Sequence, residues 1–225
     1  MDNAFRVLVA DDHPLYRAAL LQVLQQFIGD ALPLQLQEAD TISRVRELLQ
    51  AAPDLDLLIL DLHMPGTSGL TGLAALRKVH PLIPIAVISG DQRAEAIRVA
   101  ARLGAVAYLP KTLPPGELAE IIRQVLDGQH WFPNDVQEID MKKIERIAAF
   151  ACNVAALTPQ QSKIYQLASA GMLNKQIGHE LGIAVATVKS HVSAVLRTLH
   201  VRDRKQLIVM AKALEVYDDD DLTAS

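Results

Sequence analysis

Three carboxylates, a hydroxyl and an amine lie at the ends of short apolar runs in this sequence. The carboxylates are Asp11, Asp12 and Asp61, the hydroxyl belongs to Ser89, and the amine belongs to Lys111. Neighbouring carboxylates repel one another unless a cation lies among them, and oxygen ligands of this kind suit Mg²⁺. The amine and the hydroxyl would complete a site for a phosphoryl group, whose transfer needs positioning and charge neutralisation. The sequence therefore predicts phosphoryl-transfer chemistry with Asp61 as the nucleophile.

The apolar runs that carry these residues read as five buried strands. They alternate with five segments of helical spacing, which favours a parallel sheet with helices on both faces. The carboxyl ends of parallel strands meet at one edge, so groups that follow different strands come together there. The predicted strands cover residues 5–10, 32–37, 57–60, 85–88 and 105–109.

Each of these residues also has an ordinary structural explanation when it is taken alone. An Asp pair after a strand often caps a helix, a Lys is commonly a surface charge, and a Ser commonly belongs to a turn. Their joint placement after four different strands is what favours a functional site.

Composition and length limit the class of protein. The chain has 225 residues, of which 50% are hydrophobic, and this length suits two domains. The single cysteine, Cys152, excludes an internal disulfide framework and fits a reducing compartment. No leader and no apolar stretch of about 18 residues is recognisable, so we expect a cytoplasmic protein without a membrane segment.

The charges are distributed unevenly along the chain. The net charge is -4, with 11 Lys and Arg against 15 Asp and Glu in residues 1–127. Residues 157–217 instead carry 8 Lys and Arg against 3 Asp and Glu, and residues 218–221 are all Asp. A basic module behind an acidic one suggests nucleic acid as the partner of the second half.

The second half reads as short helices with defined ends. Thr158 is a favoured N-cap, and Gln161 completes a capping box three residues later. Asn174 is predicted to cap the next helix and Gly182 to end it. The predicted helices cover residues 158–170, 174–181, 185–199 and 204–216, and residues 136–151 of the connector also have roughly helical spacing.

The third of these helices has two different faces. A short helix, a tight turn and a longer helix with a basic face are typical of a helix-turn-helix, whose second helix enters the DNA major groove. A three-helix bundle with a merely solvated charged face is the alternative. The apolar stripe is Val188, Val192, Val195, Leu196 and Leu199, and the opposite face carries Lys189, Ser190, Ser193 and Arg197.

Four stretches of the first half resemble a known family. V-L-V-A-D-D-H-P, L-L-I-L-D-L-H-M-P-G, A-V-I-S-G and A-Y-L-P-K are similar, in order and spacing, to the receiver domain of bacterial two-component response regulators of the NarL/FixJ subgroup. The resemblance implies a flavodoxin-like doubly wound sheet with strand order 2-1-3-4-5. It also implies that Asp61 takes a phosphoryl group from the phosphohistidine of a sensor histidine kinase.

The same resemblance implies roles for the surrounding residues. Asp12, Asp61 and the backbone carbonyl of His63 would ligate Mg²⁺, with Asp11 contributing through water. Phosphoryl oxygens would be held by Ser89 and Lys111, and Tyr108 would be the aromatic that turns inward when Ser89 moves; a half-buried strand aromatic is the ordinary alternative. His63 would either alter hydrolysis of the phosphoryl group or be a surface residue without a role. Thr112 follows Lys111 where receivers commonly have Pro.

The segment from residue 157 onward resembles the LuxR-type DNA-binding domain. The resemblance implies that Lys189, Ser190 and Ser193 face the bases, that the helix from Arg204 onward forms the contact of a homodimer, and that double-stranded DNA is the partner. Gln161, Leu173 and Ala184 depart from the usual residues of the family at their positions. The residues implied to contact the DNA backbone are Lys175, Thr187, His191 and Arg197.

These observations predict a receiver domain (1–127), a partly helical linker (128–156), a DNA-binding domain (157–217) and an acidic tail (218–225). The predicted function is a phosphorylation-controlled transcription regulator that is not an enzyme. An aspartyl-phosphate hydrolase is one alternative, although its nucleophile belongs to a D-x-D pattern after the first strand. An atypical regulator whose receiver is never phosphorylated is another. Phosphorylation would act by uncovering the recognition helix or by joining two receivers.

Overall fold

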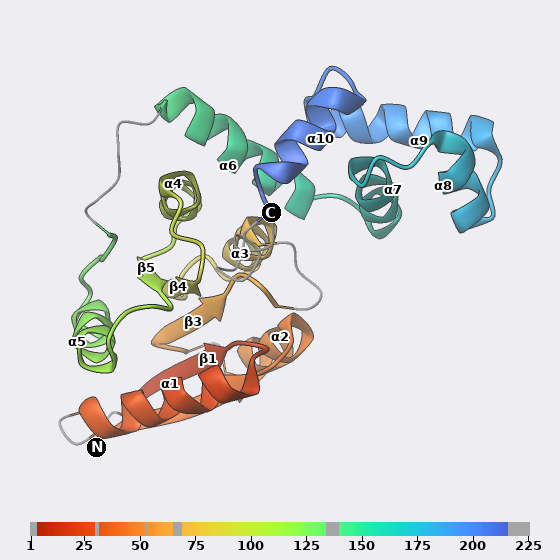
Figure 1. The fold of residues 1–225 in the computed structure, drawn as a ribbon. Coiled ribbons are helices and arrows are strands. Elements are labelled where there is room, and N and C mark those ends of the chain that lie inside the picture. Colours follow the sequence, from red (N-terminus) through yellow and green to blue (C-terminus); the bar gives the residue numbers. More distant parts are fainter. Residues whose placement is uncertain (1–3, 30–31, 53, 65–68, 134–139, 216–225) are drawn as a thin grey trace.

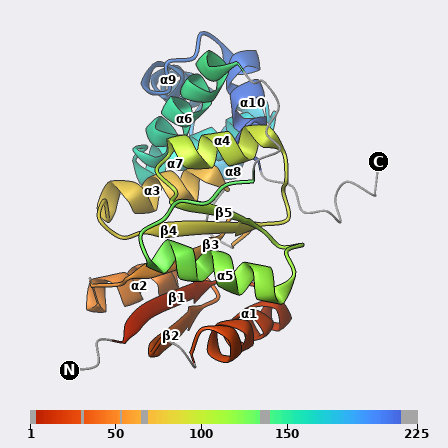
Figure 2. The ribbon, with the colours of Figure 1, turned by 90° about the vertical axis from the view of Figure 1, so that its left-hand side faces the viewer.

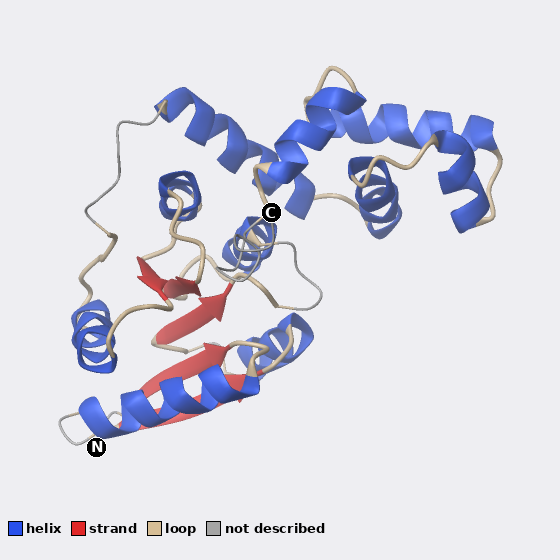
Figure 3. Cartoon of the chain, viewed as in Figure 1, coloured by secondary structure: helices blue, strands red, loops and turns tan. Residues whose placement is uncertain are grey.

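The first part of the chain is a five-stranded parallel sheet (Figures 1 and 3). The computed structural model describes residues 4–29, 32–52, 54–64, 69–133 and 140–215. The strand order β2-β1-β3-β4-β5 confirms the predicted sheet. The strands are β1 (Phe5–Ala10), β2 (Leu34–Ala39), β3 (Leu57–Asp61), β4 (Ile85–Ser89) and β5 (Ala107–Pro110).

Alternate residues of the strands enter two different hydrophobic cores. Leu8, Leu58 and Leu60 face α2 (Ile42–Ala51), α3 (Leu70–Val79) and α4 (Ala94–Arg102). The residues between them face α1 (Pro14–Phe27) and α5 (Pro115–Leu126) on the other side. Because β1 and β4 pair with its two edges, β3 is central and all five of its residues are buried. This burial fixes Asp61 at the end of a rigid strand.

Two strands begin two residues later than predicted. The N–H groups of Leu32 and Ala105 donate to carbonyls near the ends of the preceding helices, those of Ile28 and Ala100, at 2.9 and 3.0 Å. These residues therefore close helix ends instead of starting β2 and β5. At the opposite ends, β3 and β4 each extend one residue further than predicted, because Asp61 and Ser89 still belong to the ladder.

The connector packs on the first part of the chain. The N–H of Trp131 donates to the carbonyl of Val106, and its own carbonyl accepts from the N–H of Tyr108. This part of the predicted linker thus adds a contact at the edge of β5. The helix α6 (Met141–Ala155) follows, and α3 and α4 lie between it and the sheet (Figure 1). Its N-cap is Asp140, and residues 136–139 of the predicted helical stretch lie outside the described residues.

Four helices complete the described chain. The capping box of α7 is confirmed, because Thr158 Oγ1 accepts from the N–H of Gln161 and Gln161 Oε1 accepts from the N–H of Thr158. The final helix ends at Lys212, earlier than predicted, and the predicted acidic tail 218–225 lies outside the described residues. The helices are α7 (Pro159–Ser169), α8 (Asn174–Leu181), α9 (Val185–Thr198) and α10 (Arg204–Lys212).

The prediction that Asn174 caps α8 is wrong. The N-cap is Leu173, whose N–H donates to Gln176 Oε1 at 2.7 Å, while Leu173 itself offers no side-chain acceptor. Asn174 Oδ1 lies 3.3 Å from a guanidinium nitrogen of Arg204, so this side chain links α8 to α10. The Asn174 side chain thus makes a hydrogen bond to another helix instead of the predicted capping bond to its own helix.

Candidate functional site

The carboxyl edge of the sheet brings the predicted phosphoryl-transfer residues together. Lys111 Nζ lies 2.9 Å from Asp61 Oδ2 and 3.0 Å from Asp11 Oδ2. The Lys111 N–H also donates to the carbonyl of Ser89 at 2.9 Å, which joins the ends of β4 and β5. Asp11, Asp61 and Ser89 are buried. A carboxylate pair, an ammonium group and a hydroxyl-bearing residue therefore converge at one edge.

The charges at this edge do not balance. Burial is the main cause that raises the pKa of Asp61, and the nearby Asp11 raises it further, while Lys111 opposes both. Burial disfavours the charge on Lys111, but Asp61 and Asp11 together raise its pKa above the usual value. Lys111 therefore stays protonated, and one ammonium faces several carboxylates.

Replacing Asp61 by Asn should stabilise the metal-free protein. Because the folded-state pKa of Asp61 is raised, the native state binds more protons than the unfolded state from its ordinary value of 3.8 upward. The stability that this carboxyl contributes is thus lost as the pH rises through the raised pKa. We expect a gain on the order of 1 kcal/mol, or about 2–4 °C in Tm, for Asp61→Asn in EDTA at pH 7.

The control for this stability measurement is Asp54→Asn. The Asp54 side chain is 68% exposed and pairs with Arg6 at the surface, so its removal should leave the Tm within about 1 °C. A lower Tm for Asp61→Asn than for the wild type would contradict the expected cost of its buried charge.

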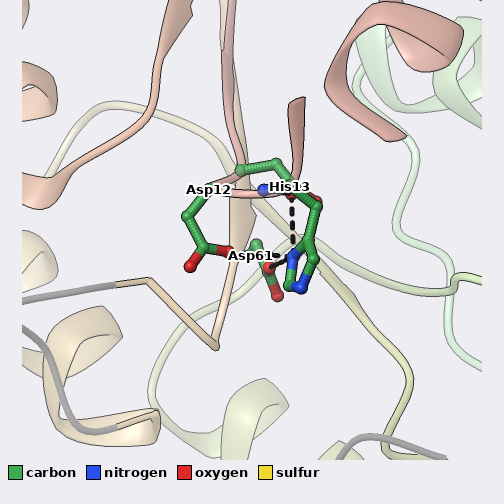
Figure 4. Close-up of side chains that lie close together, drawn as sticks. Asp12, His13 and Asp61 are labelled. Carbon is green, nitrogen blue, oxygen red and sulfur yellow. Dashed lines mark hydrogen bonds and ion pairs between the residues drawn. The ribbon is translucent and has the colours of Figure 1, made fainter. Parts of the chain in front are cut away.

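His13 lies in the same cluster, and sequence reasoning missed it (Figure 4). Its Nδ1 is 2.9 Å from Asp12 Oδ1, 3.4 Å from Asp11 Oδ1 and 3.9 Å from Asp61 Oδ2. Donor atoms of these four residues all lie within 4.8 Å of one another. The sequence did contain a signal for this residue, because His13 directly follows Asp11 and Asp12 in the D-D-H motif.

The donor atoms at this edge fit a divalent cation. Asp11 Oδ2 and Asp12 Oδ1 are both buried and accept no hydrogen bond from the described part of the chain. Each has one cationic or potentially cationic neighbour, Lys111 and His13 respectively, at ion-pair distance. Carboxylate oxygens without hydrogen-bond donors are the ligands that Mg²⁺ prefers, so the residues present match the predicted cofactor.

Tyr108 and His63 both contact the edge. The Tyr108 ring is fully buried, and its hydroxyl donates to the carbonyl of Asp91 at 2.6 Å. Burial, more than any neighbouring charge, raises the pKa of Tyr108. The ring is thus already turned inward rather than half-buried. His63 is half-buried, and its N–H donates to Asp61 Oδ1 at 3.1 Å.

The loop with Thr112 in place of Pro still delivers Lys111 to the edge. Thr112 Oγ1 lies 3.4 Å from Gln92 Nε2, across the ends of β4 and β5. Within the described ranges every peptide bond is trans. The departure from the common receiver pattern therefore does not remove the lysine from Asp61.

The predicted recognition helix α9 presents its polar face to solvent. Gly182 ends α8 with a φ of 64°, and a side chain at Gly178 would meet the carbonyl of Ile183 at 2.8 Å, so the turn between the helices is tight. Val188, Val192 and Val195 are buried against α7 and α8. The predicted DNA-contacting residues that are exposed are Lys175, Thr187, Lys189, Ser190, Ser193 and Arg197.

The sheet does not cover α9 in this structure. Figures 1 and 2 show α9 on the side of the molecule away from the strands. His191 is half-buried, and its Nε2 lies 3.3 Å from Gln160 Nε2. Unlike the other predicted DNA-contacting residues, it is therefore not fully exposed. The hypothesis that the first part of the chain hides the recognition helix is not what this structure shows.

Two family models match the chain. The response regulator receiver domain matches residues 7–123, and the luxR family of bacterial regulatory proteins matches residues 155–211. The chain is 37% identical over 213 residues to the glycerol metabolism activator of Pseudomonas putida, covering 92% of this chain and 95% of that protein. It is 31% identical to the nitrate/nitrite response regulator protein NarP of Escherichia coli, covering 89% and 91%.

Solved structures share the fold. RcsB from Salmonella enterica serovar Typhimurium, bound to a promoter in the presence of the phosphomimetic BeF3-, is similar with a TM-score of 0.56 and 22% identity, covering 94% of this chain and all of that one. An RcsB–DNA complex gives a TM-score of 0.55 at 21% identity, covering 94% and 99%. Among the described residues, no helix is long and apolar enough to cross a membrane.

Proposed function

Because this chain belongs to the response regulators that join a receiver domain to a LuxR-type DNA-binding domain, we propose that it is a phosphorylation-controlled transcription regulator. Members of this family are transcription regulators and not enzymes. The observation that carries the proposal is the convergence of Asp61, Lys111 and Asp11 at the sheet edge, in a chain that also exposes the polar face of α9.

In the proposed reaction, a carboxylate oxygen of Asp61 attacks the phosphorus of a kinase phosphohistidine. The P–O bond to Asp61 forms as the P–N bond breaks, and the electron pair returns to the histidine nitrogen. The Lys111 ammonium and the Ser89 hydroxyl hold the phosphoryl oxygens. A bound Mg²⁺ would neutralise part of the charge, held by Asp12, Asp61 and the carbonyl of His63, with Asp11 through water and His13 as a neighbour.

In the proposed DNA complex, α9 enters the major groove of double-stranded DNA. Lys189, Ser190 and Ser193 read base edges, because they share the exposed face of the helix. The residues proposed to hold phosphates and sugars are Lys175, Thr187, His191 and Arg197.

The active form is proposed to be a homodimer that joins through α10. Val209 on this helix is 65% exposed, so it offers an apolar side chain to a contact between two copies. Two recognition helices related by a two-fold axis would bind an inverted repeat.

The proposed division of the chain is a receiver at 1–127, a linker at 128–156 and a DNA-binding domain at 157–217. The regulator is placed in the cytoplasm, where it would meet both the kinase and the DNA. The free, exposed Cys152 suits that reducing compartment.

Selection from a pool of random DNA duplexes tests this function. The protein treated with Mg²⁺ and acetyl phosphate should enrich an inverted repeat and bind it at least 10-fold more tightly than untreated protein. Asp61→Asn, treated in the same way, should bind like the untreated wild type. Equal affinity of treated and untreated wild type for the selected duplex would contradict control by phosphorylation.

A further inference from the structure

Asp91 is a buried carboxylate that the phosphoryl-transfer chemistry does not use. Only 3% of it is exposed, and it lies two residues after Ser89 in the segment between β4 and α4. Its N–H donates to Ser89 Oγ at 3.1 Å, and its carbonyl accepts from the Tyr108 hydroxyl at 2.6 Å. The backbone of Asp91 is therefore tied to Ser89, which is proposed to hold the phosphoryl group, and to the buried Tyr108.

The side chain of Asp91 holds Arg93. Arg93 Nε lies 3.0 Å from each Asp91 carboxylate oxygen, and Nη2 lies 2.6 Å from Oδ2. The Arg93 N–H also donates to Asp91 Oδ1 at 2.9 Å. Such a paired, charge-assisted contact makes the guanidinium follow the carboxylate whenever the segment moves.

The same guanidinium reaches the DNA-binding part of the chain. Arg93 Nη2 donates to the carbonyl of Glu215 at 2.8 Å, across 122 positions of sequence. Glu215 follows α10, and its N–H donates to the carbonyl of Lys212 at the end of that helix. Glu215 lies beyond Lys212 and the C-cap Ala213, so this bond holds the segment that leaves α10. A continuous path joins Ser89 to α10.

Other contacts also join the two parts of the chain. The helix α6 packs on α3 and α4, and Lys143 on α6 pairs with Glu95 on α4 at 2.5 Å. These contacts hold the connector whether or not Arg93 is engaged. The contact of Arg93 with Glu215 differs because it ties α10 to the residues next to Asp61.

We propose that Asp91 and Arg93 form a link through which an acyl phosphate on Asp61 controls α10, an inference that rests on the function proposed above. The phosphoryl oxygens need donors, and Ser89 is the next residue of β4 after the one that pairs with Asp61. When Ser89 Oγ turns toward these oxygens, the Asp91 N–H loses its acceptor. The segment then shifts and Arg93 leaves Glu215, so that α10, whose Val209 is already exposed, is free to reorient toward a second copy. Arg93 is thus a positioning residue.

The test compares full-length Arg93→Ala with Arg98→Ala, which removes an exposed arginine from α4, the helix whose N-cap is Arg93. Unphosphorylated Arg93→Ala should bind the selected duplex about 5- to 10-fold more tightly than unphosphorylated wild type, and acetyl phosphate should add correspondingly less. Phosphoryl uptake, measured by intact mass, and the affinity of the phosphorylated form should be unchanged. Arg98→Ala should match the wild type throughout.

Amide hydrogen exchange gives a readout that needs no DNA. Exchange at residues 213–215 should be faster in Arg93→Ala and in phosphorylated wild type than in unphosphorylated wild type. Arg93→Lys keeps the charge but cannot hold Asp91 with two nitrogens and reach Glu215 as well. Its exchange rate at residues 213–215 should therefore lie between those of unphosphorylated wild type and Arg93→Ala.

Two results would overturn the link. One is an Arg93→Ala variant whose DNA affinity increases on phosphorylation by the same factor as that of the wild type. The other is an Arg93→Ala variant whose amide exchange at residues 213–215 equals that of the wild type. Failure of the function itself would look different, because the wild type would then take up no phosphoryl group or bind DNA equally in both states.

Discussion

Replacing Asp61 by Asn will abolish the phosphoryl group that the wild-type protein acquires from acetyl phosphate and Mg²⁺. The wild type should gain one phosphoryl group per chain, and the variant none, as measured by intact mass. The reason is that an amide lacks the anionic oxygen that attacks phosphorus. Lys111 loses its ion pair with residue 61 in this variant, but its ion pair with Asp11 still holds it at the edge. We expect the largest effect of any single substitution in the receiver here, because the acceptor atom itself is removed.

A matched acid at the surface provides the control for the loss of uptake. Asp54→Asn makes the same chemical change at an exposed side chain that pairs only with Arg6 among the ion pairs described for it. It should take up one phosphoryl group like the wild type. A phosphoryl group retained by Asp61→Asn would show that another side chain accepts it, and the mechanism proposed for this edge would then be wrong.

The same measurement separates the two alternatives considered for the first half of the chain. An atypical regulator that is never phosphorylated predicts no mass gain in the wild type. An aspartyl-phosphate hydrolase predicts a nucleophile after β1, so the gain would survive Asp61→Asn and be lost on substitution of Asp11 or Asp12.

The placement of Asp61 could be predicted because it depends on sequence patterns alone. Apolar runs of about five residues alternate with amphipathic segments, and this alternation determines a parallel sheet whose carboxyl ends share one edge. Asp11, Asp61, Ser89 and Lys111 each adjoin one of those runs, so errors of two residues at the starts of β2 and β5 did not move them. The position of the site depends on the carboxyl ends of the strands and not on their amino ends.

The surroundings of the edge could not be predicted in the same way. The contact of Arg93 with Asp91 is local, but its bond to Glu215 joins residues 122 positions apart, and no periodicity encodes such a pairing. His13 belongs to the cluster only because α1 starts at Pro14 and directs the imidazole back toward Asp12. The packing of α6 on α3 and α4 likewise depends on a tertiary arrangement that apolar spacing does not specify.

Reversing the charge of Lys189 should weaken DNA binding by about 100-fold or more without affecting the fold or phosphorylation. Lys189 is exposed on α9, while the neighbouring Val188 is fully buried, so Lys189→Glu leaves the helical core intact. A lost base contact costs about 1–3 kcal/mol, and each subunit of a dimer would lose one. The added carboxylate also repels the DNA phosphates, so the slope of log affinity against log salt should become shallower. Fluorescence anisotropy with the selected duplex measures both effects.

Lys142→Glu makes the same charge change on an exposed position of α6 and separates a specific contact from the overall charge of the protein. Because long-range repulsion is screened within about 8 Å at physiological salt, this control should lose less than about threefold in affinity at 150 mM salt. If both variants weaken binding equally, the charge of the whole molecule governs its affinity and α9 is not the recognition helix. A large loss confined to Lys189→Glu, with unchanged phosphoryl uptake, requires that the exposed face of α9 contacts DNA directly.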